Sequence, residues 1–178
     1  MEKPTTLIDS IRAEYSRYKA VAESAIAQLS DQELGLAESA GSNSVAVIMR
    51  HVGGNLSSRF TDFLTTDGEK PWRHRDSEFE DKSQSRAELV AYWESSWRIL
   101  FDTLANLVDF ELERRVTIRG IGLSVSEALA RSLAHTAYHV GQIVYVAKAI
   151  RGSDWKHLSI APGQSESFNR DPVRPPLD

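Results

Sequence analysis

Apolar side chains recur at every third or fourth position along four long stretches of this chain. That spacing places them on one face of an α-helix, and it predicts helices over residues 6–29, 43–65, 85–107 and 124–152. The second helix can be capped by Asn43 or Ser44, and the fourth by Ser124 or Ser126. We therefore expect an all-α fold, built as a four-helix bundle.

Three shorter patterns lie between these helices. Ser30 opens a capping-box pattern that predicts a short helical turn. Residues 66–83 are rich in charged side chains and lack a sustained period, so we expect a long exposed connection that Trp72 and Phe79 anchor. Alternating polar and apolar residues at 115–125 predict a small hairpin or an irregular crossover before the last helix.

The fourth helix is apolar around much of its circumference, which predicts that it is the most buried of the four. Beyond it, residues 153–178 contain Trp155 and Phe168 among several prolines, and we expect this tail to pack over the bundle as extended chain. A chain of 178 residues, 41% of them hydrophobic, can bury one continuous core. Residues 1–178 are therefore expected to form a single domain.

Charge and composition narrow the functional classes. The net charge is -4 and no helix carries a basic stripe, which disfavours nucleic-acid binding. No stretch approaches the roughly 20 apolar residues of a membrane span, and the N-terminus has no apolar secretory segment, so we expect a cytoplasmic protein without a membrane partner. The absence of cysteine excludes disulfides, thiolate ligands and a cysteine nucleophile. Any metal site must use nitrogen and oxygen ligands.

The histidines carry the most informative chemistry. His135 and His139 lie four residues apart on the fourth helix, so their β-carbons share one face about 6 Å apart. Apolar neighbours direct both rings toward the interior, where an imidazole needs partners for both nitrogens. A metal on one nitrogen and a carbonyl or carboxylate on the other meets that need. His51, in phase with the apolar face of the second helix, joins them if the two helices are neighbours.

A simpler interpretation competes with the metal site. A single helical histidine is more often a core residue that is hydrogen-bonded to protein than a metal ligand, and for His51 alone this interpretation is favoured. For the pair His135 and His139 the two interpretations are balanced. His74 and His157 stand among polar residues and are assigned to the surface.

Three convergent histidines leave coordination positions open, as a catalytic or substrate-binding site requires. Zinc and nickel suit this ligand set best, followed by iron and manganese. The ion would activate water or a thiol, or polarise a carbonyl. Asn55, Tyr138 and Gln142 are the candidates for contacts with a small-molecule substrate, and no residue is assigned a catalytic role.

The segment HTAYHVGQI at residues 135–143, with Asn43 and Ser44 leading into His51, resembles the DinB/YfiT-like superfamily of metal-dependent enzymes. The resemblance covers about residues 5–152, and the tail is similar to an uncharacterised branch. It implies a four-helix bundle in up-down-down-up order with a long crossover, frequent homodimers, and a metal triad at His51, His135 and His139. Characterised members activate a low-molecular-weight thiol or water in transferase, isomerase or hydrolase reactions.

Together these patterns favour a metal-dependent enzyme. Its reaction is either the transfer of a thiol to a small molecule or the hydrolysis of that small molecule. The alternative is a non-catalytic module that binds a small ligand or acts in a stress response, with hydrogen-bonded core histidines. In that case, alanine replacements would lower stability, while metal and chelators would make no difference.

Overall fold

The computed structural model describes residues 6–39, 41–80, 82 and 84–171. The described chain is mostly helical, which confirms the all-α expectation. Its only sheet within these residues is a two-stranded antiparallel hairpin, as predicted. None of the described helices combines the length and apolar character needed to cross a membrane. In chain order the elements are α1 (Leu7–Ile26), α2 (Asp31–Leu34), α3 (Val45–Phe60), η1 (Arg75–Glu78), α4 (Arg86–Asn106), η2 (Asp109–Glu113), β1 (Arg115–Ile118), β2 (Ile121–Ser124), α5 (Val125–Arg151), η3 (Gly152–Asp154) and α6 (Ser165–Arg170).

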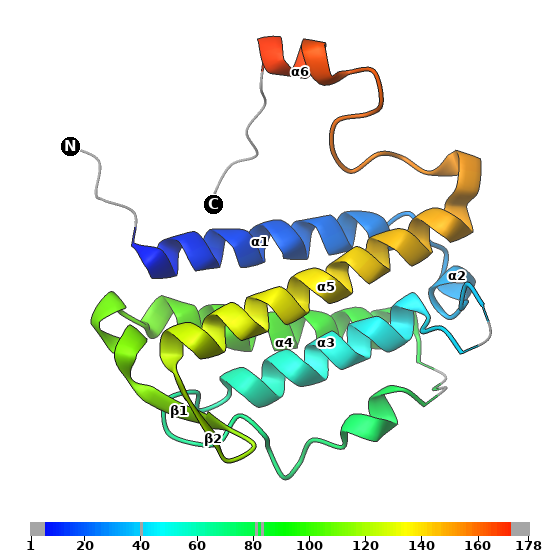
Figure 1. Ribbon diagram of the computed structural model, residues 1–178. Helices are drawn as coiled ribbons and strands as arrows, with labels where there is room; N and C mark the ends of the chain where they lie inside the picture. Colours follow the sequence, from blue (N-terminus) through cyan, green and yellow to red (C-terminus); the bar gives the residue numbers. More distant parts are fainter. Residues whose placement is uncertain (1–5, 40, 81, 83, 172–178) are drawn as a thin grey trace.

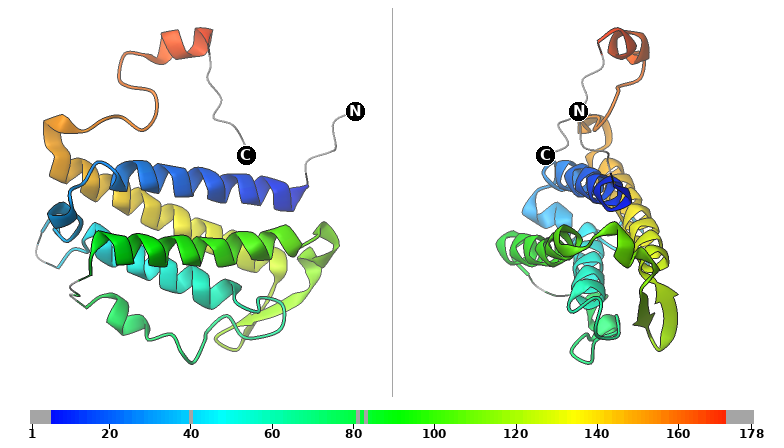
Figure 2. Two further views of the ribbon diagram at one scale, coloured as in Figure 1. Left: turned by 180° about the vertical axis from the view of Figure 1, so that it is seen from behind. Right: turned by 90° about the vertical axis from the view of Figure 1, so that its left-hand side faces the viewer.

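The four long helices lie side by side, with α1 and α5 running in one direction and α3 and α4 in the other (Figure 1). Seen end-on in Figure 2, they surround a shared interior. The largest side chains with almost no exposure there include Trp93 and Trp97 of α4 and Tyr15 of α1. The ring of Tyr15 meets that of Trp97 edge-on, with centroids 6.2 Å apart. Aromatic packing between α1 and α4 therefore fills one side of the core.

Side-chain caps determine where the helices begin. Ser44, rather than Asn43, accepts a hydrogen bond from the backbone N–H of Val47 at the start of α3. Ser124 caps α5 in the same way, and the predicted capping box at Ser30 opens α2. Helix α3 ends at Phe60, earlier than the predicted position 65, because the chain becomes extended at the next residue.

Helix α3 is the most buried long helix, so the prediction that the last helix would be is wrong. Thirteen of the sixteen residues of α3 are buried, against nine of the twenty-seven residues of α5. The reason is that α3 packs against α4, α5 and η1 at once. Helix α5 keeps an outer face in solvent, where Tyr138 and Tyr145 are exposed.

The connection between α3 and α4 is not the exposed loop that its charged composition indicated. Arg73 and Glu78 are buried within it. Arg50 of α3 donates hydrogen bonds to the backbone carbonyl oxygens of Glu78 and Glu80, at 3.2 and 2.8 Å. These contacts fasten the connection along α3, because the buried charges find partners there.

Only one of the two predicted anchors of this connection packs inward. Trp72 is 52% exposed, whereas Phe79 is half-buried. The ring centroid of Phe79 lies 4.9 Å from that of His51. The connection therefore covers one side of the His51 ring.

The tail beyond α5 contacts the helices near its beginning. Trp155 and Leu158 pack against the core, and the side chain of Gln28 exchanges two hydrogen bonds with the backbone of Lys156. Two short helices, η3 and α6, lie where extended chain was expected. Helix α6 has no buried residue and stands apart from the long helices (Figures 1 and 2). The assignment of residues 1–178 to one domain stays a prediction.

Candidate metal centre

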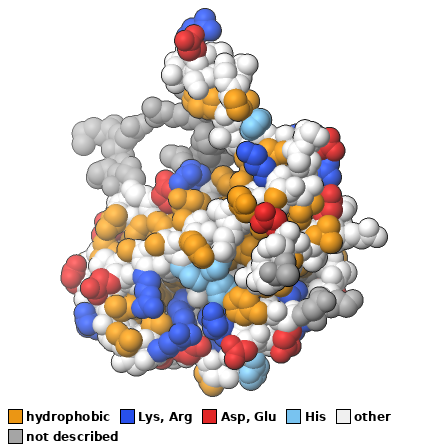
Figure 3. Space-filling view, turned by 45° about the vertical axis from the view of Figure 1, so that its right-hand side comes forward, with side chains coloured by type: hydrophobic (Ala, Val, Ile, Leu, Met, Phe, Trp, Pro, Cys, Tyr) orange, Lys and Arg blue, Asp and Glu red, His pale blue; other side chains and the backbone are white. Residues whose placement is uncertain are grey.

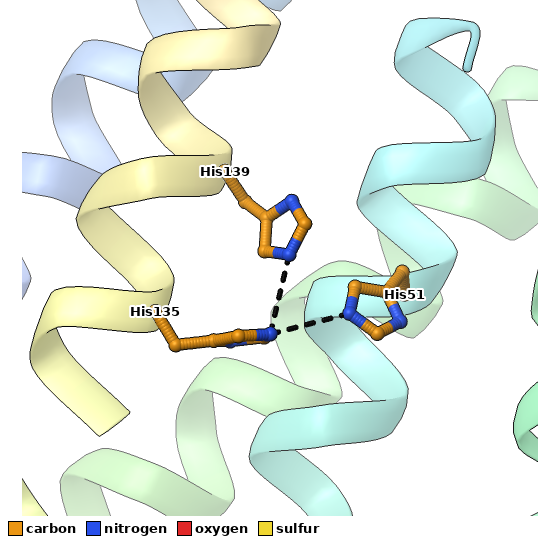
Figure 4. Close-up of side chains that lie close together, drawn as sticks. All are labelled: His51, His135 and His139. Carbon is orange, nitrogen blue, oxygen red and sulfur yellow. Dashed lines mark hydrogen bonds between the residues drawn. The ribbon is translucent and has the colours of Figure 1, made fainter. Parts of the chain in front are cut away.

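Three imidazole rings meet between α3 and α5 (Figure 4). His51 projects from α3, while His135 and His139 project from successive turns of α5. The Nε2 atom of His135 lies 3.3 Å from Nε2 of His51 and 3.2 Å from Nε2 of His139. The structure thus brings together the three histidines that the sequence indicated, hereafter the triad. His74 and His157 are exposed, as predicted.

In two rings of the triad, the outer nitrogen, Nδ1, which points away from the other rings, makes a hydrogen bond that holds the ring in place. Nδ1 of His51 donates to Oε2 of Glu78 at 2.8 Å. Nδ1 of His139 donates to Oε1 of Gln142 at 2.7 Å, and Nε2 of Gln142 donates in turn to the hydroxyl oxygen of Tyr138. A neutral imidazole that carries its proton on Nδ1 has a lone pair on Nε2. Both rings therefore direct a lone pair toward His135.

Burial opposes the protonated forms of His135 and His139, which limits the hydrogen bonds that the triad can make within itself. Burial, together with repulsion from the other two imidazoles, lowers the pKa of His135 to about 3. Burial also lowers the pKa of His139, although its hydrogen bond to Gln142 acts in the opposite direction. Additional protons on these two rings are therefore disfavoured. A neutral His135 can direct one proton at only one of its two neighbours. At least one pair of facing lone pairs stays without a proton between them, which is unfavourable unless a cation binds there.

The separations of the His135 Nε2 atom from its two neighbours fit a single ion. With metal–nitrogen distances of about 2.0–2.1 Å, tetrahedral angles place neighbouring ligand nitrogens about 3.3 Å apart. The two separations from Nε2 of His135, 3.2 and 3.3 Å, agree with that value. Three neutral nitrogen ligands without sulfur or carboxylate suit zinc or nickel, and also iron or manganese. The triad could therefore hold one divalent ion, and its ligand atoms all lie within 4.8 Å of one another.

Glu78 is a site residue that the sequence analysis missed. It is 8% exposed and accepts hydrogen bonds from Nε and Nη2 of Arg73 at 2.8 and 3.0 Å, in addition to the one from His51. Burial alone would raise the pKa of Glu78, but the hydrogen bonds and the positive charge of Arg73 outweigh it and hold the pKa below its ordinary value. An ionised Glu78 fixes the tautomer of His51 and increases the basicity of its inner nitrogen.

Gly54 allows Glu78 to approach α3. A β-carbon at this position would lie 2.1 Å from Oε1 of Glu78, and that carboxylate is held in place by Arg73 and His51. We expect Gly54→Ala to lower the free energy of unfolding by about 1–3 kcal/mol, although alanine favours the helix, because the forced displacement outweighs helix propensity. Chemical denaturation measures the change.

Gly141→Ala on α5 is the matched control for that substitution. Nothing lies within 4 Å of the β-carbon that it would add. It should leave stability unchanged or raise it by up to about 1 kcal/mol. Equal effects at Gly54 and Gly141 would show that Glu78 does not occupy the described position.

The three candidate substrate-binding residues lie on two sides of the triad. Asn55 lines a cleft of about 210 Å³ together with His51 and His135. Tyr138 is 64% exposed on the other side, and Gln142 is already engaged with the ring of His139. On the face of the molecule drawn in Figure 3, histidine side chains reach the surface near the middle, and Lys and Arg side chains gather beside them. Substrate contacts by these three residues stay a prediction.

Comparison with known proteins assigns the chain to a family whose function is unknown. The chain matches the model of the family described as protein of unknown function DUF1572 over residues 2–164, which include the whole triad. No curated protein and no solved structure matches it significantly. The chemistry must therefore be argued from the site.

Proposed function

We propose a metal-dependent enzymatic function for this chain, which belongs to the DUF1572 family of proteins of unknown function. In this proposal, one divalent ion is held by His51, His135 and His139. The observation that carries the proposal is the convergence of three Nε2 atoms, two of them on rings whose outer nitrogens already donate to Glu78 and Gln142. Core histidines that only stabilise the fold would pair donors with acceptors instead.

The resemblance to the DinB/YfiT-like superfamily supports the same assignment. The superfamily takes one metal ligand from its second long helix and an HxxxH pair from its last, and all three positions are histidine here. Helices α3 and α4 run opposite to α1 and α5, with a long connection between them. This arrangement supports our inference of an up-down-down-up four-helix bundle.

The proposed reaction is transfer of a low-molecular-weight thiol to a small electrophile, or hydrolysis of that electrophile. A divalent ion on three imidazoles keeps open coordination positions and lowers the pKa of a bound water or thiol. Glu78 and Gln142 act as positioning residues, because each holds one imidazole through its outer nitrogen. Asn55 contributes a polar side chain to the wall of the adjacent cleft, where a substrate would lie.

Protein purified without a nickel column, stripped with a chelator and reloaded with zinc or nickel tests this proposal. We expect the ion to confer either conjugation of glutathione to a nitroaromatic chloride or hydrolysis of p-nitrophenyl acetate. His139→Ala should lose this activity, and His74→Ala, which changes an exposed histidine, should keep it. If His139→Ala only lowers the unfolding temperature, and ion and chelator change nothing, the protein is a non-catalytic binding module.

A further inference from the structure

Arginine side chains dominate the cleft that opens beside the triad. Its volume of about 210 Å³ far exceeds the roughly 10–15 Å³ that one water requires, so a small molecule can enter. Among the residues that the structure describes, no aspartate or glutamate lines it. The arginines come from α3, the connection before α4, the hairpin and α5, and they are Arg59, Arg73, Arg75, Arg119 and Arg131. We call this space the arginine cleft.

The nearby carboxylates do not neutralise these arginines one for one. Glu69 pairs with both Arg59 and Arg119, at 3.2 and 2.8 Å. Glu78 pairs with Arg73 but also accepts the hydrogen bond from His51. Asp76 pairs with Arg75 at 3.7 Å, so the five arginines of the cleft share three carboxylate partners within the described ranges. The arginine cleft therefore keeps a positive excess, which favours an anionic group over a neutral one.

Arg131 is the arginine best placed to meet an anion. It lies one helical turn before His135, so the two residues share one face of α5. Its side chain is exposed, and within the described part of the chain no ion pair or hydrogen bond involves its guanidinium group. Arg119 engages Glu69 through Nε, so its two Nη atoms can face the cleft. A planar guanidinium fork is suited to a carboxylate or a phosphate.

Apolar side chains also line the arginine cleft. Phe60, Phe63 and Ile118 line it, and all three side chains are buried in the fold. Ligand sites commonly combine such apolar walls with a few polar groups that orient the ligand. The expected ligand therefore has an apolar body as well as a charged end.

We propose that the arginine cleft binds a small molecule with an apolar body and a carboxylate or phosphate group, which Arg131 and Arg119 contact. The other end of this molecule reaches the triad through His51 and His135, which line the same space. The assignment of this molecule as the substrate rests on the proposed metal-dependent function. Anion binding itself does not require the ion and can be measured without it.

Calorimetric titration of chelator-treated protein tests the proposal. The probes are benzoate and phenyl phosphate, with benzamide as the neutral counterpart of benzoate. We expect one or both anions to bind at least about 10-fold more tightly than benzamide, because charge-assisted hydrogen bonds to arginine are lost in the amide. A preference between the two anions identifies the group. Benzamide binding as tight as the binding of both anions, or no binding of benzoate and none of phenyl phosphate, would overturn the proposal.

Arg131→Ala should weaken anion binding at least about 10-fold, and Arg131→Lys should weaken it less. Arg12→Ala is the control, because Arg12 is an exposed arginine of α1 that pairs with Asp9 away from the cleft. Unfolding temperatures verify that each variant folds. An unchanged affinity in folded Arg131→Ala contradicts the assignment. Metal binding without anion binding refutes the anion site alone. Anion binding without metal binding refutes the proposed function and the assignment of the anion as its substrate, and leaves the anion site standing.

Discussion

Replacing His135 with alanine is expected to raise the dissociation constant for zinc at least about 100-fold. Its Nε2 atom lies 3.3 Å from Nε2 of His51 and 3.2 Å from Nε2 of His139, where it can share one ion with both. Removing a group that only hydrogen-bonds to a metal ligand typically lowers metal affinity by about 10–100-fold. Removing a ligand itself should lower the affinity more. Competition with a chromogenic chelator measures the constant.

His74→Ala is the matched control for this experiment, since it removes an exposed histidine outside the triad. It should bind one equivalent of zinc with the affinity of the unchanged protein. If His135→Ala and His74→Ala bind zinc equally, the triad is not the metal site. A comparison of unfolding temperatures in the presence of chelator separates loss of the ligand from loss of the fold.

Removing the Glu78 carboxylate should lower the free energy of unfolding by about 3–5 kcal/mol. Glu78→Ala leaves the guanidinium group of Arg73 buried without its charge partner, because the Arg73 side chain is only 2% exposed. The same change removes the acceptor for Nδ1 of His51, so zinc affinity should fall by about 10–100-fold. Denaturant titration and zinc competition measure the two effects.

Two further variants make this prediction specific. Glu78→Gln retains an oxygen acceptor without the charge and should cost less stability than the alanine variant. Glu80→Ala removes an exposed neighbouring carboxylate, and stability should change by less than about 0.5 kcal/mol. A Glu78→Ala variant as stable as Glu80→Ala would contradict the buried ion pair.

The helices and the hairpin could be predicted because their signals are local. Caps at Ser44 and Ser124 and the regular apolar spacing depend on residues within a few turns of one another. The relative burial of α3 and α5 could not be predicted in this way. It depends on the connection before α4, which packs against α3, and apolar periodicity does not show which other segment covers a helix.

The three candidate metal ligands could be predicted from the sequence, and most of their surroundings could not. The spacing of four residues between His135 and His139 indicated that these two side chains share a site. His51 was assigned to the same site mainly because of the family resemblance. Glu78 lies in a charge-rich segment that resembles exposed loop, and only its contacts with Arg73 and His51 account for its burial. The arginine cleft combines residues from four separate segments, so no local pattern predicts it.

A crystal structure of the zinc-loaded protein, with anomalous data collected at the zinc edge, would show whether the triad binds the ion. We expect one anomalous peak between α3 and α5, about 2.0–2.1 Å from Nε2 of His51, His135 and His139. A zinc-loaded crystal with no peak there, or with zinc bound only at His74 or His157, would contradict it.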